Sequence, residues 1–266
     1  MSDPKPHLSN TQCEMYWKCG EQYRRRYMEG ERLPPGVAMM TGSGVHGGAE
    51  INFRQKIDSR KDIPRKDIVD AAVAAFDAAG SNGYALTDDE AGRGAKAVLG
   101  EARDQTAALA ELHAKEQAPD YQPVAVECQS RIVFPNASRD LLAITDLRDN
   151  RNRIIDIKTA GKRMAQSDVD HSFQLTIYAA AYQLDYGVPP DEVRFDVLTK
   201  TKIPQRQVVR SQRTQADFQV LINRVNATTA GIDAGLFMPA SPGAWWCSQK
   251  WCGFARTCPY FNPERI

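Results

Sequence analysis

The spacing of apolar and polar positions predicts helices over the first part of the chain. In the segment 9–27, aromatic and cysteine side chains recur at steps of three and four residues, which is typical of one face of a helix. The members of this face are Tyr16, Cys19, Tyr23 and Tyr27. Ser9 is suited to cap the helix, and the Pro-Pro-Gly run at 34–36 predicts the end of this unit. A second helix is expected to begin near Thr41.

A helical pattern rich in alanine and charged residues continues from Ile63 to Gln117. It is interrupted around Gly80–Gly83, where the glycines favour a turn. The stretch carries no recognisable chemistry. We therefore expect residues 60–118 to form a helical insertion that packs beside the core or lines a substrate channel.

Beyond residue 123 the pattern changes to short apolar runs separated by turn residues, which is typical of strands. The predicted strands are Val124–Phe134, Leu141–Leu147, Arg153–Thr159, Val193–Thr199 and Gln207–Val209. Two helices are predicted between and after them, at Ser167–Tyr186 and Thr214–Ala234. A helix-rich half followed by this order of strands and helices predicts an α/β fold with a mixed sheet flanked by helices, in a single domain over residues 1–266.

The composition is that of an ordinary globular protein, with 42% hydrophobic and 25% charged residues. The net charge of +1 does not indicate a nucleic-acid partner, so any basic binding surface must be local, at clusters such as Arg24–Arg26 or the stretch 200–213. Taken alone, each cluster is better explained as a solvated face of the protein. The polar first ten residues do not resemble a signal peptide, and no segment reaches the roughly 18 apolar residues of a membrane span. We therefore expect no membrane partner and a cytoplasmic location, in a bacterium or a phage-infected host cell.

The six cysteines are unevenly placed. Three of them, Cys247, Cys252 and Cys258, fall within twelve residues near the C-terminus, which favours a metal site over chance. A fourth ligand must come from elsewhere, and Cys13 and Cys19 both stand near the N-terminus. Spacing alone does not separate zinc from an iron–sulfur cluster. Cys128, in the first predicted strand, is interpreted as a core residue.

Two acids and a lysine stand on neighbouring predicted strands. Asp156 and Lys158 are two residues apart, so the alternation of a strand places both side chains on one side. Asp146 ends the preceding apolar run, ten residues earlier. Converging carboxylates make the oxygen-rich environment that Mg²⁺ prefers, and a nearby lysine can orient water or stabilise charge on a phosphate. Each feature taken alone is also explained by an ion pair or a turn.

These residues, in order with three further motifs, resemble the RecB-like branch of the PD-(D/E)xK nucleases from Leu8 to Pro259. The run Gly42-Ser43-Gly44-Val45-His46 matches that family's glycine followed by a histidine metal ligand on a helix. Gln174 and Tyr178, four apart on a predicted helix, match its glutamine and tyrosine motif. The opening segment of the chain is similar to its N-terminal signature.

The resemblance implies a restriction-endonuclease-like core and a Mg²⁺- or Mn²⁺-dependent deoxyribonuclease. The implied metal ligands are His46, Asp146, Asp156 and the backbone carbonyl of Ile157; the implied catalytic residues are Asp146, Asp156, Lys158, Gln174 and Tyr178. The implied activity is that of an exonuclease in DNA recombination, repair or phage DNA processing. The implied partner is DNA with a free end or a single strand, and a recombination partner protein or a homo-oligomer stays open. The alternative is a catalytically silent DNA-end-binding or scaffold protein on the same fold.

The chain is also similar to the iron–sulfur branch of that family, which includes AddB and CRISPR-associated adaptation nucleases. That resemblance implies a 4Fe–4S cluster bound by Cys19, Cys247, Cys252 and Cys258, with zinc as the alternative. The segment 237–266 would then pair with the N-terminal helix at 9–30.

Three positions depart from the family pattern or stay open. Gly20 follows the first cysteine ligand where the family usually has proline, and Ala143 stands three before the first acid where it often has glycine. Neither change removes a ligand. Glu127, on the strand before the hairpin, is a further candidate metal ligand. The sequence favours the alternative that it is an ion-paired or exposed strand residue.

Overall fold

The computed structural model describes residues 6–262, so the ends of the expected domain 1–266 and of the segment 237–266 lie outside the described residues. The chain divides into two compact units. Of the described residues, the smaller unit comprises 6–33, Arg131–Leu142 and 219–262, and the larger comprises Pro34–Ser130 and Ala143–Phe218.

The described residues contain a six-stranded mixed sheet. Its strands are β1 (His7–Ser9), β2 (Pro123–Ile132), β3 (Asp140–Asp149), β4 (Arg153–Ala160), β5 (Glu192–Thr199) and β6 (Arg206–Ser211). The main path runs β1-β3-β4-β5-β6, and β2 pairs with β3. β1 lies parallel to β3 and β4 parallel to β5, whereas β3 with β4 and β5 with β6 are antiparallel. The predicted mixed α/β class is confirmed. The sequence pattern did not predict β1, because a strand of three residues has too few positions to show an alternation.

Burial explains why these segments pair. Seven of the eight residues of β5 are buried, which is typical of a central strand covered on both faces. Ile155 and Ile157 of β4 contribute to an apolar core of the larger unit. Helix residues such as Val45 and Phe53 pack against them.

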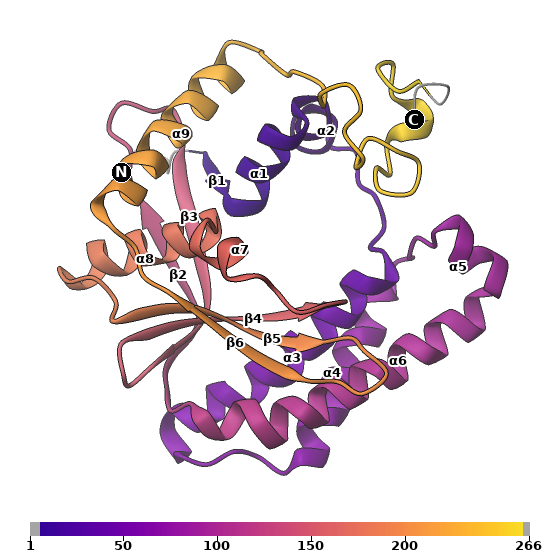
Figure 1. Ribbon diagram of the computed structural model, residues 1–266, viewed down its shortest axis with the longest axis vertical. Coiled ribbons are helices and arrows are strands. Elements are labelled where there is room, and N and C mark those ends of the chain that lie inside the picture. The colour runs from indigo at the N-terminus through magenta and orange to yellow at the C-terminus, as the bar shows by residue number, and fades with distance from the viewer. Residues whose placement is uncertain (1–5, 263–266) are drawn as a thin grey trace. The chain divides into compact units, whose positions relative to one another are not determined.

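The helices of the larger unit follow the pattern closely. They are α3 (Val37–Ser59), α4 (Arg65–Gly80), α5 (Asp88–Arg93) and α6 (Ala95–Leu112), followed by the turns η2 (His113–Gln117) and η3 (Ala118–Asp120). Figure 1 shows α3, α4 and α6 together on one side of β4, β5 and β6. The predicted start of α3 near Thr41 is wrong, because the helix begins directly after Gly36, whose backbone is extended.

The prediction of a single helix over Ser167–Tyr186 is also wrong. The chain forms two helices, α7 (Gln166–Asp170) and α8 (Phe173–Tyr186). The break occurs because Ser172 adopts an extended backbone and its hydroxyl accepts a hydrogen bond from the Leu175 N–H at 3.3 Å, which starts a new helix. Gly187, with a φ of 75°, ends α8 as predicted.

The smaller unit begins with α1 (Asn10–Lys18), α2 (Gly20–Tyr23) and the π-helical turn η1 (Arg24–Met28), and it also holds most of α9 (Gln215–Asp233) and the turn η4 (Ala255–Thr257). Ser9 caps α1 in a reciprocal pair with Gln12, as its residue type predicted. The expectation of one continuous helix to Tyr27 is wrong, because Cys19 is extended, with φ −164° and ψ 104°. The aromatic face survives the break, since the Tyr23 ring lies 5.5 Å from that of Tyr16.

Within the described residues, no helix is both long and apolar enough to cross a bilayer.

Two glycines let α3 and α4 approach closely. A Cβ built on Gly48 would lie 2.8 Å from the Ile68 carbonyl oxygen and 2.9 Å from the Cβ of Ala72. On Gly44, the preceding glycine of the same helix face, it would meet the Ala72 carbonyl oxygen at 2.8 Å. The glycines before and after His46 therefore serve the packing of the helix that carries it.

We predict that Gly48→Ala destabilises the protein by about 1–3 kcal/mol, because the methyl group overpacks a backbone contact that cannot move. Gly42→Ala is the matched control, since its Cβ would meet only the Thr159 hydroxyl at 3.6 Å. That change should be neutral or stabilise the helix by about 0.5–1 kcal/mol. Thermal unfolding followed by circular dichroism measures both, and equal melting temperatures for the two variants would contradict the packing argument.

Candidate active site

The candidate site lies where β3 and β4 stop pairing. Their antiparallel register includes Leu147 with Ile155 and Arg148 with Ile154. Just beyond it, the Asp146 carboxylate accepts a hydrogen bond from the Ile157 N–H at 2.9 Å. The Asp146 carboxylate, and not a backbone carbonyl, thus accepts from the Ile157 N–H, which holds Asp146 of β3 against β4.

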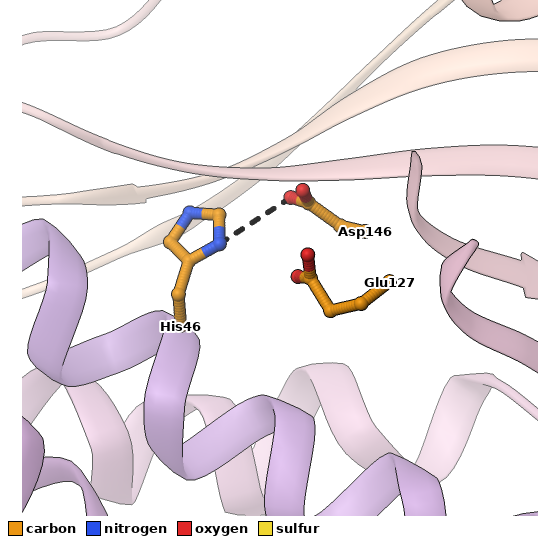
Figure 2. A group of neighbouring side chains, drawn as sticks. All are labelled: His46, Glu127 and Asp146. Carbon is orange, nitrogen blue, oxygen red and sulfur yellow. Dashed lines mark ion pairs between the residues drawn. The ribbon is translucent and has the colours of Figure 1, made fainter. Parts of the chain in front are cut away.

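Helix α3 contributes an imidazole to this point. His46 Nδ1 lies 3.5 Å from an Asp146 carboxylate oxygen, as the dashed line in Figure 2 shows. An imidazole from α3 and a backbone N–H from β4 therefore meet at the Asp146 carboxylate.

Glu127 of β2 completes the group, and its backbone explains how. Its φ of 49° lies in the left-handed region, which is uncommon for a residue with a side chain and turns that side chain away from the ordinary alternation of a strand. One ligand atom from each of His46, Glu127 and Asp146 lies within 4.8 Å of the other two. Figure 2 shows the three side chains pointing toward one another. A small cavity of about 10 Å³, the space of roughly one water molecule, is lined by all three and by Ile157.

The charges of this group are poorly compensated by protein. Burial raises the pKa of Asp146 well above its ordinary value, and the neighbouring Asp156 raises it further, while Lys158 lowers it. Burial and then Glu50 raise the pKa of Glu127. Burial lowers the pKa of His46, which favours the neutral ring with a free lone pair. Two carboxylates and a neutral imidazole around a small cavity fit a hard divalent cation.

Asp156 and Lys158 lie beside this group in a second set of contacts. Lys158 Nζ lies 2.7 Å from an Asp156 carboxylate oxygen, as expected for side chains on one side of β4. The Gln174 amide links them, because its nitrogen donates to Asp156 at 2.8 Å and its oxygen accepts from Lys158 at 2.9 Å. Gln174 also donates to the Tyr178 hydroxyl at 2.7 Å. Both of these residues belong to α8.

The structure thus gathers the residues proposed from sequence, although their roles stay predictions. Asp156 is 1% exposed, and it is not one of the three residues whose ligand atoms cluster. Glu127, which the sequence favoured as an ordinary strand residue, lies in that cluster instead. The sequence did show an acidic residue on the strand before the hairpin. It could not show that this residue adopts a left-handed backbone conformation, because glutamate rarely does so.

A second group of ligand-type side chains lies in the smaller unit. Cys19, Cys247, Cys252 and Cys258 all line one cavity. Burial raises the pKa of Cys247, and the charges of the other three thiols raise it further. Gln22 donates a hydrogen bond to the Cys252 sulfur at 2.9 Å. Sequence reasoning left Cys13 as a competitor, but it does not line this cavity, and burial raises its pKa to about 12.

The unusual glycine after Cys19 has a packing reason. The Gly20 N–H donates to the Met238 carbonyl at 2.7 Å, a bond that proline cannot make. A Cβ at this position would lie 2.7 Å from the Met238 nitrogen. The C-terminal segment therefore requires both the free N–H and the missing side chain.

Comparison with known proteins places this arrangement in a family. The model of the PD-(D/E)XK nuclease superfamily matches residues 7–259. The chain is similar to the crystal structure of a "Putative exonuclease" from Eubacterium rectale, with a TM-score of 0.55 at 12% identity over 89% of this chain and 84% of that one. The structure of SSO0001 matches at 12% identity over 94% and 95% of the two chains, but its TM-score of 0.37 supports no argument.

No curated protein sequence matches the chain. At 12% identity, the likeness to the solved structure shows a shared fold alone. The family match, in contrast, spans nearly the whole chain and includes every residue of the candidate site. The chain belongs to the PD-(D/E)XK nuclease superfamily.

Proposed function

We propose that this protein is a Mg²⁺- or Mn²⁺-dependent deoxyribonuclease, with exonuclease action on DNA in recombination, repair or phage DNA processing. The observation that carries the proposal is the convergence of His46, Glu127 and Asp146 beside the Asp156–Lys158 pair. Membership of the nuclease superfamily supports the reaction class. The fold shared with the "Putative exonuclease" supports the exonuclease form of it.

His46, Glu127, Asp146 and the Ile157 carbonyl would hold the cation, with Asp156 as a further ligand on the adjoining side. When bound, such a cation polarises a phosphoryl oxygen and lowers the pKa of a coordinated water. The protein's part is to keep the imidazole neutral and to hold the carboxylates close together. The N–H of Ile157 offsets part of the rise that burial causes in the pKa of Asp146, because a hydrogen bond to the charged carboxylate favours the ionised form.

Lys158 is placed for the phosphate and the attacking water. Its ammonium can orient the water or stabilise the negative charge that grows on the phosphate oxygens. Gln174 holds both the ammonium and Asp156, so it fixes their separation, and Tyr178 in turn holds Gln174. Removing Gln174 would therefore release two catalytic groups at once.

We further propose that the four clustered cysteines bind a 4Fe–4S cluster. The four thiols line one cavity, and the resemblance of the sequence to the iron–sulfur branch of the family supports a cluster over zinc. Cys13, at the competing position, does not line that cavity.

We predict that the wild-type chain degrades end-labelled DNA with Mg²⁺ or Mn²⁺ and not with EDTA. Lys158→Ala should lower the rate by at least about a hundredfold while the melting temperature stays near that of the wild type, because the ammonium acts on transition-state charge. Lys96→Ala, at an exposed lysine on α6, is the matched control and should cut normally. Wild-type turnover by the Lys158 variant would refute its catalytic role. DNA binding without cleavage by the wild type would favour the silent end-binding alternative.

We predict that Glu127→Gln raises the Mn²⁺ concentration needed for half-maximal cleavage by about tenfold or more, because a ligand carboxylate is lost. Glu111→Gln, at an exposed glutamate on α6, controls for the general loss of one negative charge. Calorimetric titration of Mn²⁺ into both variants gives the affinities directly. An unchanged metal requirement would remove Glu127 from the ligand set.

We predict that anaerobically purified protein is brown and contains iron and acid-labile sulfide. Cys19→Ala should bleach it and lower its melting temperature, because metal binding is coupled to folding. Cys13→Ala is the control, and it should keep the colour although it removes a buried thiol. Colourless protein with one zinc per chain would replace the cluster by zinc, and colourless, metal-free and stable protein would refute both.

A further inference from the structure

The loops that follow β4 and β5 carry an unusual concentration of cations. Lys162 and Arg163 follow β4, and Lys200 and Lys202 follow β5. The segments 160–165 and 199–207 contain no acidic residue. In a chain with a net charge of only +1, this is a local excess of positive charge.

Hydrogen bonds fix the backbone of both loops. The Lys200 N–H donates to the Ala160 carbonyl at 2.7 Å, which joins one loop to the other. The β5–β6 turn is closed by the Thr199 N–H, which donates to the Gln205 carbonyl at 2.9 Å. The Gln207 amide both accepts from the Met164 N–H and donates to its carbonyl, each at 2.9 Å. The cations are therefore presented on an ordered backbone.

These cations lack the partners that cations have elsewhere in the molecule. Within residues 6–262, no carboxylate lies within 4.0 Å of the charged groups of Lys162, Arg163, Lys200 or Lys202. Lys200 is half-buried, and burial alone lowers its pKa. Arg206, in the same hairpin, shows the contrast, because it pairs with Asp196 at 2.7 Å. A half-buried ammonium without an anion is unfavourable until an anion binds beside it.

Their position relates them to the candidate active site. The parallel register of β4 and β5 continues to Ala160 opposite Thr199, so both loops begin at the same end of the sheet. Figure 1 shows the end of β4 and the β5–β6 turn at that end. Lys158 is two residues before Ala160, about 7 Å along the strand. Both loops therefore begin close to the strand position that carries Lys158.

We propose that Lys162, Arg163, Lys200 and Lys202 form a phosphate-binding track that holds the DNA backbone next to the cleavage point. The proposal rests on the nuclease function proposed above. Contacts to phosphate are independent of base sequence, so the track positions the strand without selecting a sequence. An acidic protein surface is the other partner that such charges suit, but the short distance along β4 between Lys158 and the start of these loops favours the substrate.

The test is the salt dependence of DNA binding, measured in EDTA by fluorescence anisotropy with labelled single-stranded and double-stranded oligonucleotides. In the triple variant Lys162→Gln, Lys200→Gln, Lys202→Gln, the slope of log K against log salt should become shallower by about two to three, because each phosphate contact contributes about one. The charge-keeping variant Lys162→Arg, Lys200→Arg, Lys202→Arg should retain the wild-type slope. Lys96→Gln controls for a change in net charge away from the track. The probe that shows the larger change identifies the form of DNA that the track holds.

The outcomes separate the two proposals. If the wild type cuts DNA and the triple glutamine variant keeps the wild-type slope, the track is overturned and the nuclease stands. If the slope depends on the track but no DNA is cut, the nuclease is overturned and the track stands. Should the triple variant not fold, Lys162→Gln and Lys202→Gln alone, both at exposed positions, should each make the slope shallower by about one, and unchanged slopes overturn the track.

Discussion

The burial of carboxylates beside one another governs the candidate site. Glu127 and Asp146 share a small cavity, burial is the largest cause that raises the pKa of both, and the charge of Asp156 raises it further. The protein offsets this repulsion with one ammonium, Lys158, and with hydrogen bonds from a backbone N–H and the Gln174 amide. A bound cation would relieve the rest, so metal binding and the stability of the larger unit are linked by mass action.

The backbone meets this constraint with local departures from regular structure. The pairing of β3 and β4 gives way to a side-chain bond at Asp146, and Glu127 takes a left-handed conformation inside a strand. Such a conformation costs on the order of 1–3 kcal/mol for a residue with a side chain. Regular packing elsewhere supports it, because α3 is held against α4 through Gly44 and Gly48. In the candidate site, these two departures fall on residues that carry the charge.

Much of the fold could be predicted from the sequence, because period and apolar content report burial directly. The pattern indicated β2 to β6 and the helices, and Asp156 and Lys158 meet because strand alternation leaves them no other arrangement. The breaks at Cys19 and Ser172 were not visible, since helical spacing continues on both sides of each. Glu127 lies in the cluster because of its positive φ angle, which its residue type does not predict. Nearness between distant segments, as for Cys19 and Cys247, was available only through the family resemblance.

Gly20 carries a consequence for how such chains diverge. Its N–H and its bare α-carbon both face the backbone at Met238, near the opposite end of the chain. A relative with proline at this position has no N–H to donate, and its ring would collide with the backbone at the position of Met238. The C-terminal segment of such a relative must therefore follow a different path. The two positions are therefore expected to change together in evolution. One residue beside the first cysteine thus serves as a marker by which lineages with different C-terminal paths can be sorted.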